Sequence, residues 1–141
     1  VSKRSPDTEV SLHLCRGNAA SQWNAEGGYD RMAEVLFPKI GVDAWFMEYD
    51  DARSGGFEPL RHMPQDRKVV LGLVTTKHGR MEDAAEIEAR IDEAAKIFPR
   101  ENLGLSPQCG FASIEEGNKL AEEDQAAKLK FVVDVANEVW G

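Results

Sequence analysis

The strongest constraint on the fold is a repeated alternation of strand and helix patterns, with a period of about thirty residues, the size of a βαβ unit. Four short runs have the pattern of β-strands, and they cover residues 8–15, 42–49, 68–75 and 102–106. In the first run, Val10, Leu12 and Leu14 alternate with polar residues, as expected of a strand with one buried face. The alternation predicts an α/β fold with parallel strands.

Helical patterns lie between these runs. Residues 83–98 are the clearest, because the segment ends before a proline and its apolar residues form one stripe of Ile87, Ile91, Ala94 and Phe98. Another helix is predicted at 29–37, where apolar residues recur at helical spacing. Residues 50–67 are rich in glycine, proline and charge, which predicts a long functional loop with one short helix at about 57–62.

The last helix is predicted to follow Ser113-Ile-Glu-Glu116, which has the form of a capping box. Its inward side is predicted to carry Leu129, Val132, Val133, Ala136 and Trp140. The three tryptophans, Trp23, Trp45 and Trp140, fit packing positions better than a base-stacking role.

The predicted units correspond to half of a larger fold. A closed TIM-type barrel of eight parallel strands takes about 250 residues, whereas this chain has 141. We therefore expect residues 1–141 to form one domain, a half barrel of about four βα units. A half barrel leaves two bare strand edges, so the chain is predicted to pair with another chain, either the missing half or a second copy.

Composition narrows the possible partners. The formal net charge is −8, and no basic stretch occurs, which disfavours nucleic acid and anionic membranes. No apolar run reaches the roughly 18 residues that a membrane span needs. Only Cys15 and Cys109 are present, far apart in the chain, so free thiols or metal ligands are expected rather than a disulfide. We expect a cytoplasmic protein that acts on small molecules.

A metal site is suggested by two residues of the first strand. His13 and Cys15 are two positions apart, so their side chains leave the same face of the strand and can reach one ion. Imidazole and thiolate are a ligand pair that zinc favours. Taken alone, a His-x-Cys pair at a strand end is more often incidental.

Two further candidate ligands lie at strand ends. Glu48 is near the end of the second predicted strand and Cys109 follows the fourth. Barrel and open α/β folds gather their sites at the carboxyl ends of parallel strands. Glu48 is alternatively a solvated acid and Cys109 a small buried apolar residue. Three separate strand ends that each offer a zinc-type ligand nevertheless favour one shared metal site.

Four phrases occur in a fixed order along the chain: His13-Leu-Cys-Arg-Gly-Asn18, Glu48-Tyr-Asp-Asp-Ala-Arg-Ser-Gly55, Leu71-Gly-Leu-Val-Thr-Thr-Lys77 and Leu105-Ser-Pro-Gln-Cys-Gly-Phe-Ala112. Together they resemble the C-terminal catalytic barrel of cobalamin-independent methionine synthases, and most of all the shorter methionine synthase-like relatives. The resemblance runs from about residue 9 to Gly141 and implies that His13, Cys15, Glu48 and Cys109 hold zinc.

The resemblance also implies an activity, zinc-dependent methyl transfer from a methyl donor to a thiol such as homocysteine, as in methionine biosynthesis. Glu48 is the hardest ligand of the set, so it is expected to yield when the thiol enters. Alkyl transfer to coenzyme M and a non-catalytic half barrel with structural zinc are the alternatives. Because the family places most of its amino-acid and folate recognition before the His-x-Cys motif, we expect the chain alone to be inactive or incompletely active.

Four charged residues near the predicted strand ends are candidates for substrate binding. Asp50, Asp51 and Arg53 follow Glu48, and Lys77 follows the third strand. An arginine fork or a lysine there suits an anionic substrate group. A solvated charged loop is the alternative interpretation.

Overall fold

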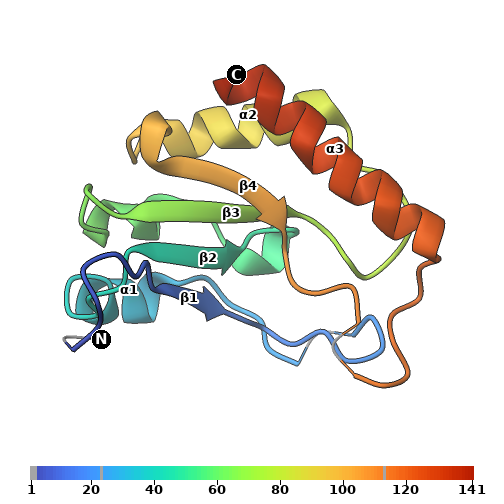
Figure 1. Ribbon diagram of the computed structural model, residues 1–141, viewed down its shortest axis with the longest axis horizontal. Coiled ribbons are helices and arrows are strands. Elements are labelled where there is room, and N and C mark those ends of the chain that lie inside the picture. Colours follow the sequence, from blue (N-terminus) through green and yellow to red (C-terminus); the bar gives the residue numbers. More distant parts are fainter. Residues whose placement is uncertain (1–2, 23, 113) are drawn as a thin grey trace.

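Four parallel strands form one sheet in the order in which they follow along the chain, as the computed structural model shows (Figure 1). The structure describes residues 3–22, 24–112 and 114–141. The strands are β1 (Ser11–Leu14), β2 (Ala44–Glu48), β3 (Lys68–Val74) and β4 (Leu103–Pro107). All arrows in Figure 1 point the same way, so the loops that follow the strands gather at one end of the sheet. The predicted α/β fold with parallel strands is confirmed.

Helices follow the strands. They are α1 (Asp30–Leu36), α2 (Ala84–Ala95) and α3 (Glu122–Trp140), with short 3-10 helices η1 (Ala52–Ser54), η2 (Glu58–His62) and η3 (Arg100–Asn102). The stripe predicted for α2 is buried, and the Asp83 carboxylate caps the helix by accepting from the backbone N–H groups of Ala85 and Glu86. The 50–67 segment is mainly loop, and its predicted short helix is η2.

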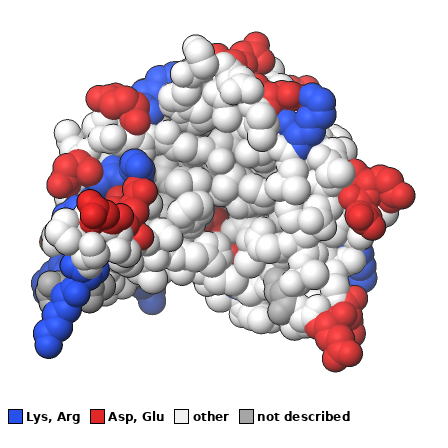
Figure 2. Space-filling view, viewed as in Figure 1, with Lys and Arg blue, Asp and Glu red and all other residues white. Residues whose placement is uncertain are grey.

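The two faces of the sheet have different roles. Trp45, Met47 and Leu71 lie on the buried face, where Trp45 packs edge-on against Phe37 at the end of α1. On the opposite face, His13, Phe46, Val70 and Gly104 lie side by side across the four strands. This second face is open, since Phe46 and Val70 are only partly buried and line a cavity of about 340 Å³. Figure 2 shows that it is largely uncharged, with charged side chains around its rim.

The start of the last helix differs from the prediction. Helix α3 begins at Glu122, where the backbone N–H of Ala121 donates to the carboxylate of Asp124. Residues 114–121 instead form a short turn and irregular backbone. Gly117 has a φ of +69° there, and the Asn118 amide donates to the carbonyl oxygen of Thr76. Ser113 of the predicted capping box, and Trp23, lie outside the described residues.

The inward side of α3 was also partly mispredicted. Leu129 and Val133 are 44% and 57% exposed, whereas Val132 and Trp140 pack against the core as expected. The buried positions are Lys128 and Val135. The Lys128 ammonium lies 2.8 Å from the Glu82 carboxylate and donates to the carbonyl oxygen of Arg80, so an ion pair holds a position that hydropathy alone assigns to solvent.

Within the described part of the chain, every helix is too short or too polar to cross a bilayer.

Candidate metal centre

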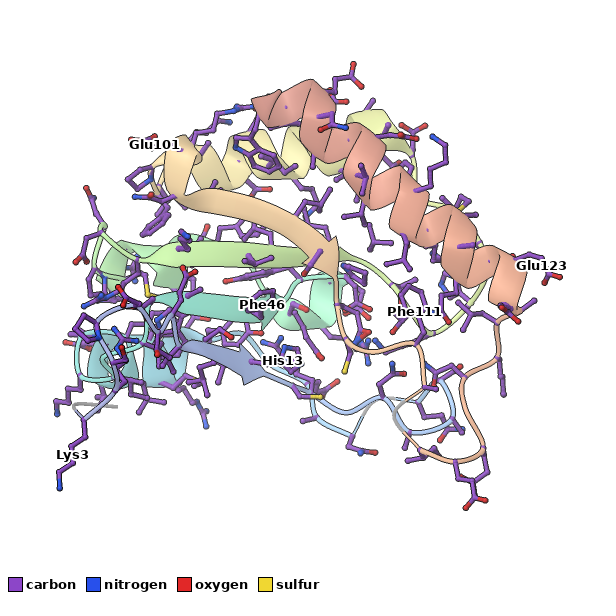
Figure 3. The ribbon with its side chains drawn as sticks, viewed as in Figure 1. Lys3, His13, Phe46, Glu101, Phe111 and Glu123 are labelled. Carbon is purple, nitrogen blue, oxygen red and sulfur yellow. The ribbon has the colours of Figure 1, made fainter. Side chains whose placement is uncertain are left out.

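The four predicted ligands converge at the carboxyl end of the sheet. One ligand atom from each of His13, Cys15, Glu48 and Cys109 lies within 4.8 Å of the other three. His13 belongs to β1, Cys15 follows it directly, Glu48 ends β2 and Cys109 follows β4. In Figure 3, the labelled His13 lies near the arrowhead of β1. Residues 94 positions apart in sequence thus meet at one point, with the sulfur atoms of Cys15 and Cys109 separated by 3.8 Å.

The strand register explains why the first three ligands meet. His13 lies beside Phe46 in the β1–β2 pair, so the next same-face position on each strand is Cys15 and Glu48. The turn after Cys15 is fixed by Gly17, whose φ is +92° and whose N–H lies 3.2 Å from the Cys15 sulfur. The Cys15 thiol, directly after β1, therefore points toward the tip of β2.

A buried hydrogen-bond chain brings Cys109 to the others across the end of β3. The Asn18 amide, in the loop after β1, donates to the hydroxyl of Thr76 at 2.8 Å and to the carbonyl oxygen of Gly110 at 2.9 Å. The Thr76 hydroxyl donates to the side-chain oxygen of Gln108 at 2.6 Å. Asn18, Thr76 and Gln108 are all buried. The loops after β1, β3 and β4 are thereby linked on either side of Cys109.

The donor set fits a zinc ion. Two thiolates, an imidazole and a carboxylate are ligands that zinc takes in tetrahedral sites. Glu48 is 2% exposed, and its Oε1 lies 3.5 Å from Nε2 of His13 but has no hydrogen-bond partner among the described residues. A buried carboxylate oxygen without a donor is costly in a folded protein, and a cation at this point offsets that cost.

The electrostatics of the cluster keep the Cys15 thiol protonated in the metal-free protein. Removal of the Cys15 sulfur from water, together with the nearby Glu48 carboxylate and Cys109, raises the pKa of the Cys15 thiol to about 11. Since zinc binds the thiolate, metal binding and proton release are coupled.

Alkylation of the metal-free protein tests this raised pKa. At pH 7.5 we expect Cys15 to react with iodoacetamide about 100-fold more slowly than an unperturbed cysteine, because the thiol form persists. The rate is expected to rise about tenfold per pH unit until the pH nears the pKa of about 11. Mass spectrometry of the Cys15 peptide measures it separately from Cys109, and a plateau below pH 9 would contradict the raised pKa.

Two residues at the site escaped the sequence interpretation. Arg16 follows the ligand Cys15, and its backbone N–H donates to Oε2 of Glu48 at 2.9 Å. Tyr29, predicted only as an apolar helix position, places its hydroxyl against the backbone of Glu48. Burial raises the pKa of Tyr29 to about 12, so it is a neutral phenol at neutral pH. The one sequence signal that could have found them is the charge of Arg16 directly after the candidate ligand Cys15.

The four predicted substrate-binding residues meet in a separate cavity. Asp50, Asp51, Arg53 and Lys77 all line a space of about 520 Å³, which none of the four candidate ligands lines. Lys77 is paired with Asp50 at 2.8 Å, and Arg53 is paired with Asp51. Their charges are thus largely matched to one another. Whether they also bind a substrate group stays a prediction.

Residues 2–138 match the family described as cobalamin-independent synthase, catalytic domain. The chain belongs to this family.

The synthase-family relatives include proteins with and without an assigned activity. An uncharacterized protein of Bacillus subtilis, YxjG, is 54% identical over 99% of the chain. A 5-methyltetrahydropteroyltriglutamate–homocysteine methyltransferase of Lactiplantibacillus plantarum is 24% identical over 82% of the chain, which covers 14% of that protein.

Among solved structures, a putative vitamin-B12 independent methionine synthase from Listeria monocytogenes is 39% identical with a TM-score of 0.75, over 99% of the chain. The likeness confirms the predicted class, an α/β fold that forms part of a TIM-type barrel. The chain spans 37% of the length of both YxjG and the Listeria protein.

Proposed function

We propose that this chain supplies the zinc-binding part of a methyltransferase site that transfers a methyl group to a thiol such as homocysteine. The observation that carries the proposal is the convergence of His13, Cys15, Glu48 and Cys109 from three strand ends, with their ligand atoms within 4.8 Å of one another. Family membership supports the reaction class. Bound zinc would lower the pKa of an approaching thiol, so that the acceptor reacts as a thiolate at neutral pH.

The exposure of the ligands favours a catalytic over a structural role. Structural zinc sites are closed by four protein ligands, whereas catalytic sites keep a position open to substrate. His13 has a side chain that is 39% exposed, and Cys15 is also exposed. Beside them, His13 and Cys109 line a cavity of about 320 Å³ on the open face of the sheet. An acceptor thiol can approach the ligand atoms from this cavity.

Each ligand has its own part in this scheme. Cys15 and Cys109 are the soft donors, and His13 is the neutral one, so these three are suited to remain on zinc throughout. Glu48 is the hard donor and is suited to yield its place to the entering thiol. Because its Oε2 is held by the Arg16 backbone N–H, the carboxylate stays near the site after it yields.

Cobalt substitution tests the proposal and selects the acceptor. With Co²⁺ in place of zinc, binding of a substrate thiol at the metal changes the thiolate charge-transfer absorption. We expect such a change on addition of homocysteine, and methyl transfer once a methyl donor and the rest of the barrel are also present. A change only with coenzyme M would assign the other acceptor, and no change with either thiol would favour the structural role.

A Glu48→Gln variant tests whether Glu48 leaves zinc when the thiol binds. We expect it to keep most of its zinc, because both thiolates and the imidazole remain, and to lose about 100-fold in methyl transfer. Zinc content of the variant measures the first effect, and its steady-state rate in the presence of the rest of the barrel measures the second. Kinetics equal to those of the unmodified protein would remove Glu48 from the mechanism.

We further propose that additional strands complete the barrel, either from the rest of a longer chain or from a second chain. The sheet has β1 and β4 as its two edges, and the chain spans 37% of the length of YxjG. The exposed Leu129 and Val133 of α3 support this, because apolar helix residues of a barrel normally face a neighbouring element. Residues of the added part would hold the methyl donor. The cytoplasmic location predicted from the sequence is part of this proposal.

A further inference from the structure

The Arg16 side chain, which is not one of the four candidate ligands, is hydrogen-bonded to the segment that precedes α1. Its Nε and Nη2 both donate to the carbonyl oxygen of Gly27, at 3.0 and 2.7 Å. Its Nη1 donates to the hydroxyl of Tyr29 at 2.7 Å and to the backbone carbonyl oxygen of Glu48 at 2.8 Å. The guanidinium carbon lies 4.0 Å from the centre of the Tyr29 ring. One side chain thus links the loop after β1, the 27–29 segment and the tip of β2.

Tyr29, which the Arg16 guanidinium contacts, binds the same strand tip. Its hydroxyl accepts from the backbone N–H of Glu48 at 2.9 Å and donates to the carbonyl oxygen of Glu48 at 3.2 Å. Glu48 is the last residue of β2. It pairs with Gly72 of β3, and the β1–β2 pairing ends one residue earlier, at Met47. Both backbone polar groups of Glu48 are therefore fixed by side chains that belong to no strand.

The Glu48 side chain is fixed at one oxygen and open at the other. Oε2 accepts from the Arg16 backbone N–H at 2.9 Å, while Oε1 faces Nε2 of His13 at 3.5 Å. A free carboxylate can rotate and exchange its two oxygens, but this one is held at its backbone and at Oε2. The oxygen that faces His13 is Oε1, which has no hydrogen-bond partner among the described residues.

We propose that Arg16 and Tyr29 form a positioning clamp, which sets the backbone and carboxylate of Glu48 so that Oε1 faces the metal. Arg16 and Tyr29 are positioning residues, since neither contributes one of the four clustered ligand atoms. The proposal rests on the metal site of the proposed function and adds two residues to it. Second-sphere partners of this kind typically change metal affinity by about 10- to 100-fold.

Variants of the clamp, measured on the full chain with zinc alone, test the proposal. We expect Tyr29→Phe and Arg16→Lys each to weaken zinc binding by about 10-fold or more in chelator competition and to shift the Co²⁺ ligand-field absorption. The matched control is Tyr49→Phe. Tyr49 is a buried tyrosine that packs against Tyr29, and its hydroxyl has no hydrogen-bond partner among the described residues. We expect its loss to leave zinc affinity within about twofold.

A double-mutant cycle separates positioning from a general structural effect. In a Glu48→Gln background, Tyr29→Phe and Arg16→Lys are expected to change zinc affinity by less than about twofold. Equal losses in both backgrounds, or no loss in either, would overturn the clamp. If Tyr29→Phe fails to fold, Arg16→Lys decides alone, because it retains the backbone N–H and the charge.

The same measurements distinguish the clamp from the proposed function. If the clamp variants lose zinc affinity as expected but the completed barrel transfers no methyl group, the function is refuted and the clamp stands. Normal zinc affinity in every clamp variant would refute the clamp alone, and a protein that binds no zinc at this cluster would refute both.

Discussion

Replacement of Cys109 by serine is expected to weaken zinc binding by about 100-fold or more, and His13→Ala is expected to do the same. The binding free energy of zinc to four protein ligands is about 10–16 kcal/mol, so each ligand contributes about 3 kcal/mol. Chelator competition at pH 7 measures the loss. Cys109 is the more telling position, because only the folded chain brings it within 3.8 Å of Cys15.

A histidine elsewhere on the surface is the control. His78 is exposed and lies on the loop after β3, outside the cluster of four ligands. We expect His78→Ala to bind zinc as the unmodified protein does. Affinity equal to that of the unmodified protein in the Cys109→Ser variant would show that zinc is held elsewhere, and the proposed chemistry would fail with it.

A Gly72→Ala substitution is expected to lower the free energy of unfolding by about 3 kcal/mol. Gly72 lies in β3 beside Glu48, where a Cβ would lie 2.8 Å from the Cα of Gln108 and 2.9 Å from the carbonyl oxygen of Met47. Both are backbone atoms, so the strands must separate to admit the methyl group. Urea denaturation measures the stability. Zinc affinity is expected to fall as well, because Glu48 and Cys109 lie on the two sides of this contact.

Gly104→Ala provides the matched comparison within the same sheet. A Cβ at Gly104 of β4 would meet only the side chain of Val70, at 3.7 and 3.9 Å, which is ordinary contact. We expect this variant to be neutral or more stable by about 0.5 kcal/mol, because alanine loses less backbone entropy than glycine on folding. Similar stability of the two variants would contradict the close approach of the strands at Gly72.

Local pattern was sufficient to predict the strands and the buried helix stripe. Alternation around Val10, Leu12 and Leu14 and the run from Lys68 depend on neighbouring residues alone, and β1 and β3 lie within the predicted ranges. The four candidate ligands could also be named from the sequence, since each is a zinc-type residue near the end of a strand and the family resemblance implies all four. Their actual convergence required the sheet order and the loop contacts through Asn18 and Thr76.

The remaining features depend on tertiary contacts that no local pattern encodes. Lys128 is polar by hydropathy, and only its pairing with Glu82, distant in sequence, permits burial. This shifts the inward side of α3 away from Leu129 and Val133. In the same way, the ring of Tyr29 fits the apolar stripe of a helix whatever its hydroxyl contacts, so the spacing does not reveal the hydrogen bonds of that hydroxyl. Its role at Glu48 follows from the path of the loop before α1, which no residue spacing predicts.

The long sequence separation of the ligands has a consequence for the life of the protein in the cell. Cys15 and Cys109 are 94 positions apart, so an ion that joins them would close most of the polypeptide into a ring. Because the unfolded chain does not hold these distant thiols together, zinc would bind only the folded state and stabilise it by about 4 kcal/mol at a free zinc concentration about 1,000-fold above Kd. Zinc supply would then govern the abundance of the protein as well as the proposed methyl transfer. Under metal starvation, the apoprotein would visit unfolded conformations more often and become a better target for proteases.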